Sequence, residues 1–122
     1  MRDQLKRAVL ALAQPPEVQL GLFPDFVCKA EELALDFEDG LYELVGHEDE
    51  ITAQQRAAVD ALDALLAIMS GQGNASFWTE EGVRSDPKWE EIRTAAKATA
   101  AAFGWELRPP GPSGAIYVPA GR

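Results

Sequence analysis

Apolar residues recur at helical spacing along most of the chain, which predicts a mainly α-helical protein. One run covers residues 3–14 and ends at Pro15-Pro16, because a residue that precedes proline avoids the α region. The clearest run covers residues 51–70. We expect it to form the core helix, because its large apolar residues share one face: Val59, Leu62, Leu65, Leu66 and Met69.

The second half of the chain predicts two further helices and then a change of pattern. A short helix is expected after Thr79, and a longer, alanine-rich helix over residues 87–103 with Asp86 as its cap. Residues 105–122 contain two runs typical of β-strands, WELR and AIYV, around the turn-rich PPGPSG. We therefore expect four to five packed helices with a small C-terminal β-hairpin or extended tail, in a single domain over residues 1–122.

Residues 28–50 form a strongly acidic stretch. They hold nine of the chain's twenty acids, and no Lys or Arg occurs between Lys29 and Arg56. The apolar residues of this stretch share one face of a helix that we expect to begin with Asp25 as its cap and to end at Gly46. Repulsion between neighbouring acids should cost this helix about 1 kcal/mol. Four acids gather on the face opposite the apolar one: Glu32, Asp36, Asp39 and Glu43.

Two interpretations of this acidic face are open. An acidic protein can simply have acidic helices, with a central helix that contacts two neighbours. Alternatively, the face binds a basic partner, and Leu35 and Tyr42 are then either a second core contact or exposed apolar anchors. A short acidic link follows the helix. The candidate partner-binding residues are the stripe, the two apolar residues and the link: Glu32, Leu35, Asp36, Asp39, Tyr42, Glu43, Glu48, Asp49 and Glu50.

Net charge narrows the range of partners. The formal charge is −9 and the isoelectric point is about 4.5, whereas phosphate groups require clustered Lys and Arg, and the eleven here are scattered. We therefore expect neither nucleic acid nor membrane as a partner, and the field favours a cationic one. The single cysteine, Cys28, cannot form an internal disulfide, which is ordinary in a reducing compartment, so we expect a cytoplasmic location.

The sequence predicts no catalytic residues, no metal ligands and no cofactor. A pair of Cys28 and His47 is the best nucleophilic arrangement available, but the Phe-Val-Cys context is typical of a buried, inert thiol. EF-hand spacing is absent, and a single histidine cannot supply the motifs of a di-iron bundle. A weak divalent-ion site on Glu48-Asp49-Glu50 is the alternative that the carboxylates leave open.

Small size, strong acidity and an acid-lined helix over residues 25–46 together resemble the bacterial immunity proteins that neutralise toxin domains, including those of contact-dependent inhibition systems. The resemblance is one of type. It implies a non-enzymatic protein that blocks a basic, nuclease-type toxin by direct contact, as acids of barstar do on barnase. The alternatives are a small carboxylate-based enzyme or metal-binding domain, and an acidic regulatory subunit of a larger complex.

Overall fold

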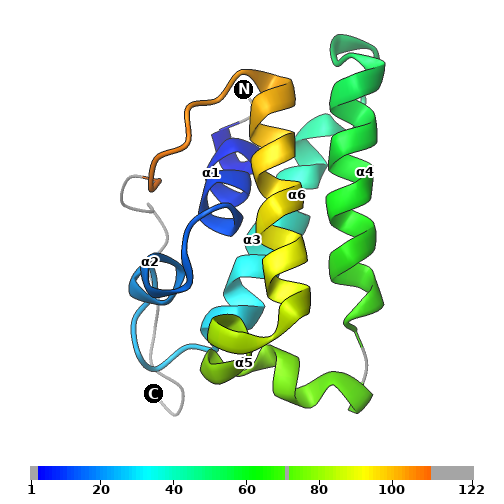
Figure 1. Cartoon of the computed structure of the whole chain (residues 1–122). Coiled ribbons are helices and arrows are strands. Elements are labelled where there is room, and N and C mark those ends of the chain that lie inside the picture. Colours follow the sequence, from blue (N-terminus) through cyan, green and yellow to red (C-terminus); the bar gives the residue numbers. More distant parts are fainter. Residues whose placement is uncertain (1–2, 71, 111–122) are drawn as a thin grey trace.

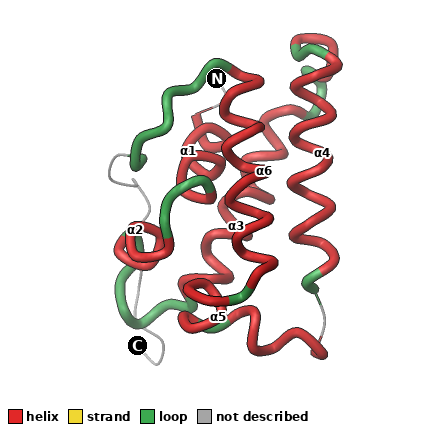
Figure 2. Tube along the Cα trace, in the orientation of Figure 1, coloured by secondary structure: helices red, strands yellow, loops and turns green. Residues whose placement is uncertain are grey.

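A computed structural model describes residues 3–70 and 72–110, and it confirms the mainly α-helical prediction (Figure 1; Figure 2). No strand occurs within these residues. In chain order the elements are α1 (Asp3–Leu12), α2 (Pro16–Gly21), α3 (Lys29–Leu41), the 3-10 helices η1 (Tyr42–Leu44) and η2 (Glu48–Glu50), α4 (Ala53–Ile68), the 3-10 helix η3 (Gln72–Trp78), α5 (Glu80–Ser85) and α6 (Pro87–Phe103).

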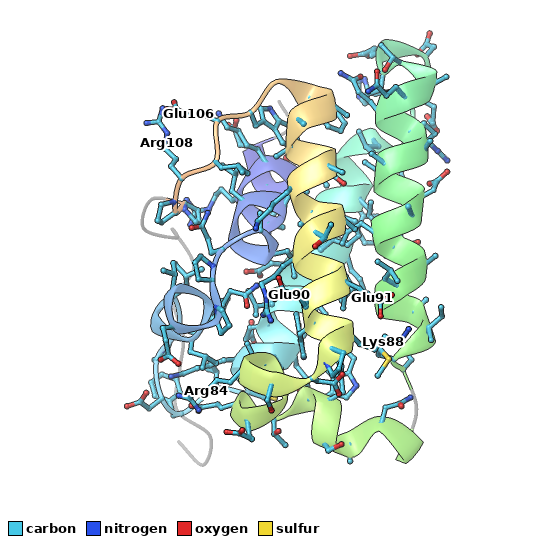
Figure 3. The ribbon with its side chains drawn as sticks, viewed as in Figure 1. Arg84, Lys88, Glu90, Glu91, Glu106 and Arg108 are labelled. Atoms are coloured by element: carbon cyan, nitrogen blue, oxygen red, sulfur yellow. The ribbon has the colours of Figure 1, made fainter. Side chains whose placement is uncertain are left out.

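The predicted C-terminal hairpin is not supported. Residues 105–108, the first of its two expected strands, have no regular secondary structure, and the second expected strand lies outside the described residues. Trp105 stacks on Phe103, with ring centroids 4.4 Å apart, so the chain turns back on the end of α6 after Gly104. Figure 3 shows Arg108 projecting outward from this segment.

The central helix is α1, not the helix over residues 51–70. It packs against α3 and α6, whereas α4 packs mainly against α6 at the side of the bundle (Figure 1). A helix that is apolar on nearly all sides must be covered on nearly all sides. Only α1 meets this condition, because its second half is buried almost without interruption: Ala8, Val9, Leu10, Ala11 and Leu12. Along α4 only a stripe is buried, and Ile68 stays 64% exposed.

A buried polar contact joins the ends of several helices. It begins in α2, the short helix that follows Pro15. There the Gln19 amide donates to the carbonyls of Ala11 (3.2 Å) and Leu12 (3.0 Å), at the C-terminus of α1. Its oxygen accepts from Arg93 Nη1 of α6 (2.9 Å), which also donates to the carbonyl of Val83 in α5 (3.0 Å). Both Gln19 and Arg93 are buried, and these bonds satisfy them.

The predicted caps of α5 and α6 are confirmed, and that of α3 is wrong. Thr79 accepts from the amide of Gly82, and Asp86 from that of Lys88. Asp25 does not cap α3. A turn in which the Val27 amide donates to the Pro24 carbonyl delays the helix to Lys29, so the Asp25 carboxylate instead pairs with Lys29 Nζ at 3.0 Å. The cap position falls on Cys28, whose side chain makes no cap hydrogen bond.

Gly40 lets α3 approach α1, which explains a glycine inside a helix. A Cβ at this position would lie 2.7 Å from the Cα of Leu5 and 2.9 Å from its backbone nitrogen. Because both neighbours are backbone atoms, we expect Gly40→Ala to push the helices apart and cost about 1–3 kcal/mol of unfolding free energy. Gly21→Ala is the control, since nothing lies within 4 Å there. Equal effects in urea denaturation would contradict this close approach.

Two leucines of α4 test how its stripe is buried. Leu62 is fully buried, whereas Leu65, also expected in the core, is only partly buried. Leu62→Ala should therefore cost roughly 2–5 kcal/mol of unfolding free energy, because it removes buried contacts and leaves a cavity. Leu65→Ala should cost clearly less. Thermal and chemical denaturation of the two variants measure the difference, and a larger loss at Leu65 would refute the observed orientation of α4.

Candidate functional site

The structure divides the acidic stripe of α3 and η1 into three partly buried residues and one that faces solvent. Glu32, Asp36 and Glu43 are partly buried, and Asp39 is exposed. Glu43 Oε1 accepts from the backbone amide of Leu5 at 2.8 Å. This amide lies in the first turn of α1, where free N–H groups and the helix dipole favour a carboxylate. The Glu43 carboxylate therefore holds the start of the central helix.

The Asp36 carboxyl has a raised pKa, because it lies partly buried on the same helix. Its pKa is raised from 3.8 to about 6, chiefly by burial and then by the neighbouring charges of Glu32 and Asp39, against the opposing effect of Arg7. Close by, the side-chain amide of Gln4 donates to the Asp36 backbone carbonyl at 3.1 Å. The middle of the stripe thus belongs to the contact between α3 and α1.

The two apolar residues of the candidate site are exposed rather than part of a second core contact. Leu35 is 47% exposed and Tyr42 is 75% exposed. Their spacing along the helix places them in one outward row with exposed acids, and we call this row, with the neighbouring Asp39, the α3 strip: Glu31, Leu35, Glu38, Asp39 and Tyr42. Glu31 and Glu38 were not predicted as site residues, although their positions beside Leu35 and Tyr42 in the helical repeat could have identified them.

The acidic link lies in η2 and is exposed throughout. Backbone amides of Glu48 itself and of Gly46 donate to the Glu48 carboxylate and lower its pKa. Glu50 accepts from His47 Nδ1, and this hydrogen bond raises the pKa of His47. Two of the three link carboxylates are therefore engaged in local contacts. Among residues 3–70 and 72–110, no group of three or more His, Cys, Asp or Glu side chains is arranged to hold a metal ion.

Between η1 and α4 the surface has two hollows that continue into each other, and we call them together the η1–α4 groove. Leu41, Val45 and Asp63 line both of them. The first has a volume of about 200 Å³, and its other lining residues are Leu44, Glu48, Arg56, Val59 and Asp60. The second has a volume of about 490 Å³ and adjoins the α3 strip, and its other lining residues are Glu38, Asp39 and Tyr42.

Cys28 and His47 do not form a pair. The Cys28 Sγ lies 3.5 Å from the carbonyl oxygen of Trp78, and His47 is bound to Glu50. The expectation of a buried thiol is wrong, because Cys28 is exposed. Cys28 occupies the N-cap position, at the end of the turn before α3. The buried residues of the helix begin after it, with Lys29 and Ala30.

The chain matches no protein-family model, no curated protein and no solved structure. Within the described part of the chain, no helix has the length and apolar character needed to cross a membrane. The function is therefore inferred from the α3 strip and the η1–α4 groove.

Asp36 gives a pH-dependent test of the contact between α3 and α1. A carboxyl whose pKa is raised on folding stabilises the native state less as pH increases from 3.8 to about 6, because the folded state holds the proton more tightly. Asp36→Asn removes this loss. We expect the variant to have a higher melting temperature than the parent at neutral pH, with the difference shrinking below pH 4.

Asp39→Asn is the matched control for this test, since it removes one charge from the same helix at an exposed position. It should raise the melting temperature at neutral pH by less than Asp36→Asn. If the gain from Asp36→Asn were equal at neutral and acidic pH, burial of the Asp36 carboxyl would not be its cause.

Proposed function

We propose that the protein is a non-enzymatic acidic binding protein that recognises a basic protein partner. The observation that carries this proposal is the exposure of Leu35 and Tyr42 among the acids of the α3 strip. The one basic residue of α3, Lys29, is buried and paired with Asp25, so it does not neutralise the strip. Exposed large apolar side chains in a charged surround are typical of contact surfaces.

The two kinds of residue in the strip would do different work. Tyrosine is enriched among the residues that dominate binding energy, because it buries a large rigid surface and keeps a polar tip. Unpaired acids at the rim mainly accelerate encounter with a cationic partner and exclude partners of the same charge. Tyr42 is thus the proposed anchor, with Leu35 beside it, and Glu38 and Asp39 provide electrostatic steering.

The specific partner that we propose is a basic toxin domain of the nuclease type, bound in the bacterial cytoplasm. Nucleases need a cationic surface to hold phosphate groups, and a small acidic protein can occupy such a surface. The net charge of −9 supports this case. The proposed result of binding is inhibition by steric block, without chemistry on the part of the inhibitor.

The test begins with affinity capture from cells that naturally make the chain, followed by binding kinetics with the purified partner. We expect a partner with net positive charge. Changing Glu38→Gln together with Asp39→Asn should slow association and flatten its salt dependence, because steering is screened by salt. Tyr42→Ala should mainly hasten dissociation, by roughly 30-fold, or about 2 kcal/mol.

The control is Glu81→Gln with Glu91→Gln, which removes two exposed acids of α5 and α6 and should leave the kinetics unchanged. Parental association rates for the Glu38 and Asp39 variant would refute the α3 strip as the partner surface. The toxin case is tested separately, by titrating the chain against the partner's enzymatic activity. Activity that persists at saturating binding would overturn that part of the proposal.

A further inference from the structure

The η1–α4 groove exists because of how α4 is attached. This helix packs mainly against α6 at the side of the bundle (Figure 1), and the two hollows lie between α4 and η1. Apolar side chains are left along this opening. Val45 is 67% exposed, Tyr42 borders it, and Leu41 is only partly buried. The groove thus offers apolar surface that no other described part of the chain covers.

The charges around this apolar surface have nearly one sign. Among the described residues that line the groove, Arg56 is the one basic side chain, and its Nε lies 3.4 Å from the Asp60 carboxylate. A surface of this kind repels acidic segments and attracts cationic ones that can also bury an apolar side chain. Five carboxylates line the groove: Glu38, Asp39, Glu48, Asp60 and Asp63.

We propose that the η1–α4 groove binds an amphipathic basic segment of the protein partner. In this arrangement one large apolar side chain covers Leu41 and Val45, and Lys or Arg side chains beside it reach Asp63 and Asp39. The inference rests on the proposed function. It adds the place at which the partner binds and the residue types that the contacting segment of the partner must contain. Two hollows that share residues make an elongated site, which suits a peptide segment better than a compact ligand.

Charge complementarity also decides between this occupant and a second copy of the chain. Two copies would bring together surfaces of the same sign on molecules that each carry a formal charge of −9. Such contact is disfavoured by repulsion at the rim, because few bases are available to offset the five acids. A cationic segment neutralises the same acids as it binds.

The experiment uses the full chain and synthetic peptides of defined chemistry. The probe is a short Lys/Leu peptide with helical amphipathic spacing. Its comparisons are a Lys/Ser peptide of the same charge and a Glu/Leu peptide of the opposite charge. Affinity is measured by calorimetry, and the site by amide chemical shifts. We expect the Lys/Leu peptide to shift the amides of Leu41, Val45 and Asp63, and to bind at least about tenfold more tightly than either comparison.

Two matched double variants locate the binding. Val45→Ser with Asp63→Asn changes one apolar and one acidic residue of the groove, and Leu35→Ser with Glu31→Gln does the same at the far end of the α3 strip. All four residues are at the surface, so both variants should stay folded. The groove variant should lose about tenfold or more in affinity, and the strip variant, whose Leu35 has only a supporting role in the proposed function, should lose clearly less.

The outcomes separate this inference from the proposed function. A larger loss in the strip variant, with shifts confined to the strip, would overturn the groove as the seat and leave the acidic binding protein supported. Equal binding of the Lys/Ser peptide would overturn the apolar contact in the groove. If none of the peptides bound, or if the Glu/Leu peptide bound equally well, both proposals would fall.

Discussion

The buried contact between Gln19 and Arg93 is the interaction on which the rest of the structure depends. A buried guanidinium must be fully hydrogen-bonded. Loss of any one of its partners is therefore costly, because it leaves part of a buried charge without a hydrogen bond. Gln19 and the Val83 carbonyl supply the inner partners, and Glu90 supplies an outer one at 3.0 Å from Arg93 Nε (Glu90 is labelled in Figure 3). Because Gln19 also binds the last carbonyls of α1, this contact secures the C-terminus of the central helix to α6, while Glu43 secures its N-terminus to the end of α3.

This attachment explains why an acidic helix can tolerate its own repulsion. Part of the stripe is used internally: Glu43 satisfies a backbone amide of α1, and Asp36 lies partly buried in the same contact, with a pKa raised by that burial. An excess of acids on a helix is therefore not by itself evidence for a partner. The evidence is the outward row, where Leu35 and Tyr42 remain exposed although buried apolar area would stabilise the fold.

The α3 strip and the η1–α4 groove share Glu38, Asp39 and Tyr42, so they form one continuous surface from α3 to α4. Its shape follows from the same packing that places α4 on α6. Acids that the sequence separates by more than twenty positions, such as Asp39 and Asp63, thereby line one hollow. A partner that contacts both elements would meet apolar side chains at the centre and carboxylates around them, which is the usual division of an interface between core and rim.

The sequence by itself determined what depends on near neighbours in the chain. These features are the mainly helical class, the apolar stripe of Val59, Leu62 and Leu66, the caps at Thr79 and Asp86, and the spacing that sets Leu35 beside Tyr42. Local periodicity states which face of a helix is apolar, but it does not state which neighbour covers that face. Only the tertiary structure decided that α1 is central, that Gln19 meets Arg93, that Asp25 pairs with Lys29 without capping α3, and that Asp63 faces Val45 across an open groove. Most of these contacts join residues far apart in sequence, and their geometry depends on how all the helices share one limited core.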